Sequence, residues 1–230
     1  MVSAKFDGAD TDHPTGHECS RWLRLAFWAS IVIALLAAAR RLIAIVYPSQ
    51  TAPSQMALDA AFASHTALTL AHVLPAMAFV LLSPLVLMRR SGTVWPQRLL
   101  FPLGAVVGVT AYAMSVHSIG GWVERSAVLL FDSFFLFSLA RAYLYMRNGE
   151  SLQKMRWLTR AIAILLGIAT TRPVMGALFA TSRLTHLEPR QFFGIAFWIG
   201  FLINTITVEL WLHRQGRKSQ PETIAIRPAM

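Results

Sequence analysis

The sequence predicts an all-α fold, a polytopic membrane protein whose six transmembrane helices form a bundle. Six apolar runs, each near the ~20 residues that a helix needs to cross a bilayer, alternate with polar connections. Of the 230 residues, 55% are hydrophobic and 14% are charged, and the mean hydropathy is +0.51. Water-soluble domains of this length rarely combine so few charges with so many apolar runs.

The apolar runs define the expected helices in chain order. The six spans cover residues 23–47, 64–88, 99–117, 126–146, 157–180 and 191–213. Together they form one domain, 23–213, between flexible cytoplasmic tails at 1–22 and 214–230. Because the later connections are short, consecutive helices should pack antiparallel as neighbours. The longest connection contains a helix-like stretch at 55–62 that we expect to lie on the membrane surface.

Basic residues gather in alternate connections, and this asymmetry predicts the orientation. They precede the first span and follow the second, fourth and last spans, whereas the other connections hold only Arg125, Arg183 and Arg190. The positive-inside rule therefore places both termini in the cytoplasm. The net charge of +10 is distributed as topology signals and not along one face, so we expect no nucleic-acid partner.

Polar residues on four predicted helices fall at about one depth. Counting ~1.5 Å of rise per residue from the outer helix ends places Arg40, His72, Asp132 and Arg172 roughly 10–12 Å below the outer surface. An arginine near the bilayer interior costs at least ~2.5–3.5 kcal/mol on insertion scales, so Arg172 should face protein or water. Pro173 removes a backbone hydrogen bond and loosens the helix beside it.

The residues of this layer suggest an ion pair and an outward-facing pocket. Asp132 and Arg172 should pair, because a short connection joins their helices. Arg40, Arg41 and Arg172 together outnumber the one acid, which favours an anion or a polarised oxygen as ligand. In the alternative, structural interpretation, the arginines beside the first span's end extend to lipid headgroups and His72 only packs between helices.

A second polar group lies near the inner surface. Glu209 falls about one turn above the end of the last span, and Arg141 lies at similar depth on the fourth. We expect a structural ion pair between Arg141 and Glu209, near Arg156 and Arg160. A proton relay is the alternative.

Histidine positions bear on haem and metal binding. His65 and His117 match in depth at the outer mouths of their helices, so they could ligate a haem from two sides, a reading that we expect to fail in an absorption spectrum. His72 has no histidine at its own depth. We expect no metal site, because no three ligands converge at suitable spacing.

Several short motifs resemble those of a bacterial membrane-protein family, domain of unknown function 2306. The resemblance covers about His72 to Trp211 and rests on His72, Arg98, Gly120-Gly121, Arg156-Trp157, Arg160, Arg172, Asn204 and Glu209. It implies a multi-helix protein of the bacterial inner membrane and by itself assigns no activity. The family pattern has histidines where this chain has Gln97 and Lys154, so a function of those histidines would be missing here.

These observations predict a membrane protein that binds a small anionic or quinone-like amphiphile in its outward-facing pocket, for electron or proton transfer or as a receptor. The expected ligand-binding residues are Arg40, Arg41, His72, His117, Asp132 and Arg172. One alternative is a proton-coupled transporter of a small organic anion, for which discontinuous helices are typical. Another is a structural or accessory subunit with a protein partner in a larger membrane complex. Membrane lipids are partners in every case, and nothing in the sequence identifies an enzymatic reaction.

Reporter fusions test the predicted orientation. Fusions after Arg90, Asn148 and Arg217 should report a cytoplasmic location, and fusions near Ala52 and Leu187 an external one, because positively charged connections remain inside. A phosphatase and a fluorescent protein, fused at the same sites, provide the opposing readouts. An external location at Asn148 would move the polar layer to the other leaflet.

Overall fold

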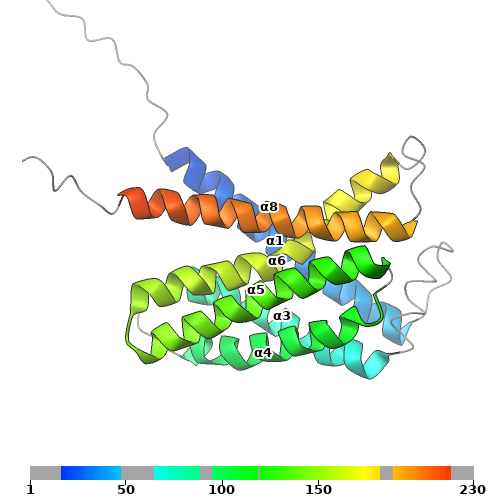
Figure 1. The fold of residues 1–230 in the computed structure, drawn as a ribbon, viewed down its shortest axis with the longest axis horizontal. Helices are drawn as coiled ribbons and strands as arrows, with labels where there is room; N and C mark the ends of the chain where they lie inside the picture. The colour runs from blue at the N-terminus through cyan, green and yellow to red at the C-terminus, as the bar shows by residue number, and fades with distance from the viewer. Residues whose placement is uncertain (1–16, 48–64, 89–94, 119, 182–188, 219–230) are drawn as a thin grey trace, which may run out of the picture.

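The computed structural model describes residues 17–47, 65–88, 95–118, 120–181 and 189–218 (Figure 1). These residues form six α-helices and no strand: α1 (His17–Val46), α3 (Thr66–Met88), α4 (Trp95–Ser115), α5 (Gly121–Arg147), α6 (Ser151–Ala180) and α8 (Pro189–Lys218). Each helix is long and apolar enough to span a membrane, which confirms the predicted all-α class with six transmembrane helices. The stretch at 55–62 lies outside the described residues.

The predicted boundaries of α5 and α6 were too narrow, and the backbone at the helix ends explains why. α5 begins at Gly121, which has a positive φ of 66°, and not at residue 126. At its other end Gly149 has a φ of 77°, and the amides of Gly149 and Glu150 donate to the carbonyls of Met146 and Tyr145. This pair of bonds is a Schellman motif, which ends a helix sharply. α6 therefore starts at Ser151, antiparallel to α5.

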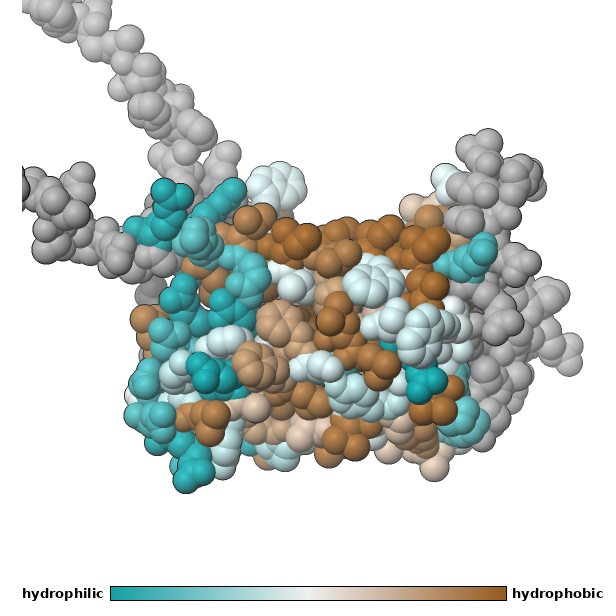
Figure 2. Space-filling model, viewed as in Figure 1, coloured by the Kyte–Doolittle hydropathy of each residue, from teal (hydrophilic) through white to brown (hydrophobic). Residues whose placement is uncertain are grey.

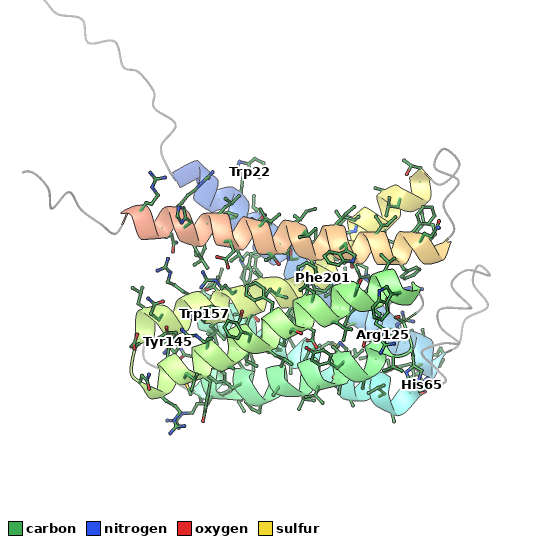
Figure 3. The ribbon with its side chains drawn as sticks, viewed as in Figure 1. Trp22, His65, Arg125, Tyr145, Trp157 and Phe201 are labelled. Carbon is green, nitrogen blue, oxygen red and sulfur yellow. The ribbon has the colours of Figure 1, made fainter. Side chains whose placement is uncertain are left out.

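The bundle has two polar ends and an apolar middle. α1 begins and α8 ends at one end, on the left in Figure 1, which we call the terminal end. The opposite end is called the His65 end after the residue labelled there in Figure 3. Figure 2 shows hydrophobic residues in a broad band between the two ends and hydrophilic residues mainly at the ends. This banding and the six apolar helices identify a multi-pass membrane protein.

α6 is the central helix of the bundle. It packs against α8, α5, α1 and α3, while α4 packs against α3 and α5. α6 and α3 remain continuous helices although they contain Pro173 and, in α3, Pro75 and Pro84. In Figure 1 the yellow, C-terminal part of α6 rises away from α5. The C-terminal part of α6 thus diverges from α5 toward the His65 end of the bundle.

Glycines bring α8 very close to α6. A Cβ atom added at Gly200 would lie 2.8 Å from the backbone nitrogen of Thr171, whose side chain is fully buried. Nearby, the Thr170 hydroxyl donates to the Asn204 side-chain oxygen at 2.7 Å, and the Asn204 amide donates to the carbonyl of Ala163 at 3.1 Å. Small residues that admit a neighbouring backbone, together with hydrogen bonds across it, are typical of helix packing in membranes.

Gly200→Ala should destabilise the bundle. The added methyl group would overlap the α6 backbone, and overpacking of this kind typically costs ~1–3 kcal/mol. Gly176→Ala in α6 is the matched control, because a Cβ there meets no atom within 4 Å and alanine favours a helix by up to ~1 kcal/mol. Thermal unfolding in detergent would measure both variants. Equal stability of the two variants would contradict the close approach.

Candidate ligand-binding cavity

A cavity of about 280 Å³ opens among the helices in the half of the bundle nearer the His65 end. Residues from all six described helices line it. Its outer part is reached by His117 and Ser118, which follow the end of α4. Its inner part reaches Phe135 and Ile164, which belong to the main hydrophobic core. The cavity therefore connects one polar end of the protein with its apolar middle.

Polarity changes along the cavity in the same direction on each of five helices. On each of these helices a polar lining residue lies nearer the His65 end than an apolar one, in the pairs Arg41 and Ala34, His72 and Val80, Ser115 and Val107, Asp132 and Phe135, and Arg172 and Ile164. A cavity with a polar outer part and an apolar inner part matches a molecule that has a polar head and an apolar tail.

The structure brings together five of the six residues predicted to bind a ligand. Arg41, His72, His117, Asp132 and Arg172 all line the cavity. The depth count from the sequence therefore selected residues that share one site.

Arg40 is the exception among the six predicted residues. It does not line the cavity. Successive helical residues point about 100° apart, and the cavity-facing side of α1 carries Arg41 with Ala37 and Ala34. Arg40 consequently belongs to the neighbouring, exposed side of α1.

The predicted ion pair between Asp132 and Arg172 is wrong. The two residues face the same cavity without a salt bridge, and the Asp132 Oδ2 atom is buried with no hydrogen-bond partner among the described residues. The two side chains face the cavity from different helices and do not meet across it. The Phe201 ring of α8 stacks on Phe131 of α5 at 5.2 Å and occupies the space beside Gly167 of α6. This ring, labelled near the centre of Figure 3, contacts both α5 and α6.

His72 is fixed by the neighbouring helix α4. Its Nδ1 atom lies 3.2 Å from the carbonyl oxygen of Val107 and 2.9 Å from the hydroxyl oxygen of Thr110. A carbonyl oxygen only accepts, so this network assigns the proton to Nδ1 and leaves Nε2 as an acceptor. A ligand in the cavity would meet a histidine of fixed orientation.

Sequence reasoning missed Glu124, which also lines the cavity. Its Oε2 atom accepts a hydrogen bond of 2.5 Å from the backbone amide of Gly120 at the start of α5. The spacing of Glu124, Val128 and Asp132 on one helical face would have revealed it, but the predicted helix began too late. With Glu124 included, two arginines face two carboxylates in the cavity, so the expected excess of positive charge is not found there.

The two histidines at the His65 end lie against each other. The ring centroids of His65 and His117 are 4.0 Å apart, with an angle of 39° between the planes. Two imidazole nitrogens on opposite faces of one iron would themselves be about 4 Å apart, and the ring centres farther still. These rings therefore do not fit a haem between them. Within the described residues no group of three or more His, Cys, Asp or Glu side chains is placed to hold a metal ion.

At the terminal end, the ion pair of Glu209 has a different partner from the one predicted. Arg160 donates two hydrogen bonds to Glu209, at 2.5 and 2.9 Å, and so joins α6 to α8. Arg141 instead donates to the Tyr145 hydroxyl at 2.7 Å. Both arginines lie at a suitable depth, but Arg160 is on α6, which packs directly and extensively on α8. Glu209 therefore pairs with Arg160 of α6 and not, as the sequence had predicted, with Arg141 of α5.

Gln97 and Lys154 lie side by side at the same end of the protein. The Lys154 Nζ atom donates to the Gln97 side-chain oxygen at 2.9 Å, joining the start of α4 to the start of α6. Neither residue lines the cavity. A function carried by histidines at these two positions would be separate from the cavity.

Comparisons with known proteins give no relative. No protein-family model, no curated protein and no solved structure matches this chain.

Breaking the pair of Glu209 and Arg160 should destabilise the bundle. Glu209→Leu removes the partner of Arg160, whose side chain is only 17% exposed. We expect the free energy of unfolding to fall by about 1–3 kcal/mol, and not more, because solvent already reaches the Glu209 side chain, which is 40% exposed. The double variant Glu209→Leu with Arg160→Leu should recover most of this loss, since no unpaired charge remains. Thermal unfolding of both in detergent measures the difference. A double variant less stable than the single one would contradict a purely structural pair.

Proposed function

We propose that the protein binds a small amphiphile of quinone-like or anionic character, with its head among the cavity's polar residues and its tail toward the protein's middle. One observation carries this proposal: on five helices the cavity lining changes from polar to apolar in the same direction. A purely structural layer of buried polar residues would satisfy itself internally. The unpartnered Oδ2 atom of Asp132 instead faces the same space as Arg172.

The charges around the cavity favour a quinone-like head over an anion. Arg41 and Arg172 supply hydrogen-bond donors, and Asp132 and His72 supply acceptors. A quinone offers carbonyl oxygens to the arginines, and its reduced form offers hydroxyl groups to the carboxylate. A simple anion would use the donors alone and would be repelled by the carboxylates.

The position of the cavity in the cell is part of the same proposal. The basic connections at the terminal end support a cytoplasmic location for both termini and an outward-facing cavity in a bacterial inner membrane. The resemblance to the family domain of unknown function 2306 supports the same location. The transporter and the accessory subunit have no specific observation in their favour, and the helices that contain proline are continuous.

Binding of a short-chain quinone and its quinol to purified protein tests this function. Loss of a hydrogen bond to a charged group costs about 1.5–3 kcal/mol, which corresponds to a tenfold or larger rise in Kd. Arg172→Leu should weaken quinone binding by this amount, because it removes a donor to the carbonyl. Asp132→Asn should weaken quinol binding more than quinone binding. Isothermal titration calorimetry in detergent measures each affinity.

Arg40→Leu is the matched control, because it removes an arginine beside the site that does not line the cavity. It should leave both affinities nearly unchanged. An equal loss in Arg40→Leu and Arg172→Leu would show that general positive charge, and not the cavity, drives binding. Binding of a carboxylate amphiphile with no binding of either quinone form would exclude the quinone-like head.

A further inference from the structure

A second cluster of charged and aromatic residues lies near the terminal end, in the opposite half of the bundle from the cavity. We call it the Arg141 cluster, and it consists of Arg141, Tyr145, Trp157, Arg160 and Glu209. Figure 3 labels two of its members, Tyr145 and Trp157, toward that end of the helices. None of the five lines the cavity.

Arg141 has no acidic partner within the described part of the chain. Its guanidinium donates one hydrogen bond, to the Tyr145 hydroxyl, and lies 5.0 Å and 5.5 Å from the ring centroids of Tyr145 and Trp157. Its Nε atom is buried and makes no hydrogen bond. The Glu209 carboxylate instead accepts hydrogen bonds from two nitrogens of Arg160. Arg141 therefore retains a positive charge and unused donors within a membrane-spanning helix.

The charges around Arg141 also sum to an excess of positive charge. Arg156 donates to the backbone carbonyl of Leu212 at 3.3 Å. Of the three arginines, only Arg160 pairs with an acid among the residues that the structure describes. Such an excess close to the membrane surface favours an anion that the protein itself does not supply.

The surface beside Arg141 fits an acyl chain. Phe137 lies one helical turn deeper on α5, is 52% exposed, and contacts Trp157 edge to face at 5.5 Å. By helix rise Arg141 is ~9 Å from the end of α5, within reach of the headgroup region for a long side chain. A cationic and hydroxyl-bearing group near the surface with an exposed aromatic ring below it matches the order of groups in a phospholipid.

We propose that the Arg141 cluster binds the phosphate of an anionic phospholipid in the leaflet at the terminal end. The guanidinium of Arg141 and the hydroxyl of Tyr145 hold the phosphate oxygens. The exposed ring of Phe137 contacts the first part of an acyl chain. The Arg160–Glu209 pair stays intact and holds Trp157 beneath the Arg160 guanidinium, which lies 4.5 Å from the ring centroid.

Native mass spectrometry of the full chain tests this site with phosphatidylglycerol and phosphatidylcholine of identical acyl chains. The wild-type protein should prefer phosphatidylglycerol, and Arg141→Gln should reduce that binding about tenfold without changing the binding of phosphatidylcholine. Arg147→Gln, an exposed arginine at the end of the same helix, is the control and should keep the preference. Equal binding of the two lipids by the wild-type protein would overturn the proposal, as would an equal loss in both variants.

A second measurement avoids reliance on a variant of Arg141 that fails to fold. In vesicles, phosphatidylglycerol with brominated chains should quench Trp157 more strongly than brominated phosphatidylcholine, with Trp157→Phe used to isolate that residue's fluorescence. Equal quenching by the two lipids would overturn the proposal. Inorganic phosphate at millimolar concentration should not displace the lipid. Displacement would identify a site for the free anion and would also overturn the assignment to a lipid.

Discussion

The close approach of α8 to α6 is the contact on which the candidate site depends. Gly200 admits the α6 backbone at Thr171, and Gly167 leaves space for the ring of Phe201. That ring stacks on Phe131 and so brings α5 into the contact between α6 and α8. With Thr171 buried against α8, the next residue, Arg172, is turned toward the cavity. A packing contact between two helices thereby determines where an arginine lies within the membrane.

The position of Arg172 matters because it lies within the bilayer. Ionisable groups in hydrocarbon are expensive unless they meet protein, water or a ligand. At the terminal end, Arg160 and Glu209 satisfy each other and connect α6 to α8. At the His65 end Asp132 and Arg172 do not pair, and Asp132 keeps an unpartnered oxygen in a space that it shares with Arg172. The same physical rule thus gives a structural pair in one half of the bundle and a candidate binding site in the other.

The sequence predicted well how deep each side chain lies in the membrane, and poorly in which direction it points around its helix axis. Hydropathy located all six helices, and helix rise placed His72, Asp132 and Arg172 at a common level, where they do line one cavity. Adjacent residues on a helix differ by about 100° in direction, however, so depth alone did not distinguish Arg40 from Arg41. Which arginine reaches Glu209, and whether Asp132 reaches Arg172, depend on contacts among helices distant in sequence. Those contacts depend on side-chain packing between helices, which the hydrophobic periodicity of the sequence does not determine.

If the polar-to-apolar order of the cavity selects an amphiphile, the purified protein should carry that molecule with it from the membrane. A mass spectrum of the organic extract, taken with an absorption spectrum of the intact protein, would identify what the cavity carries from the membrane. We expect about one molecule of a quinone-like amphiphile per chain, none of it in Arg172→Leu, and no haem absorption band. An extract that holds phospholipid alone, identical for the wild-type protein and Arg172→Leu, would contradict this expectation.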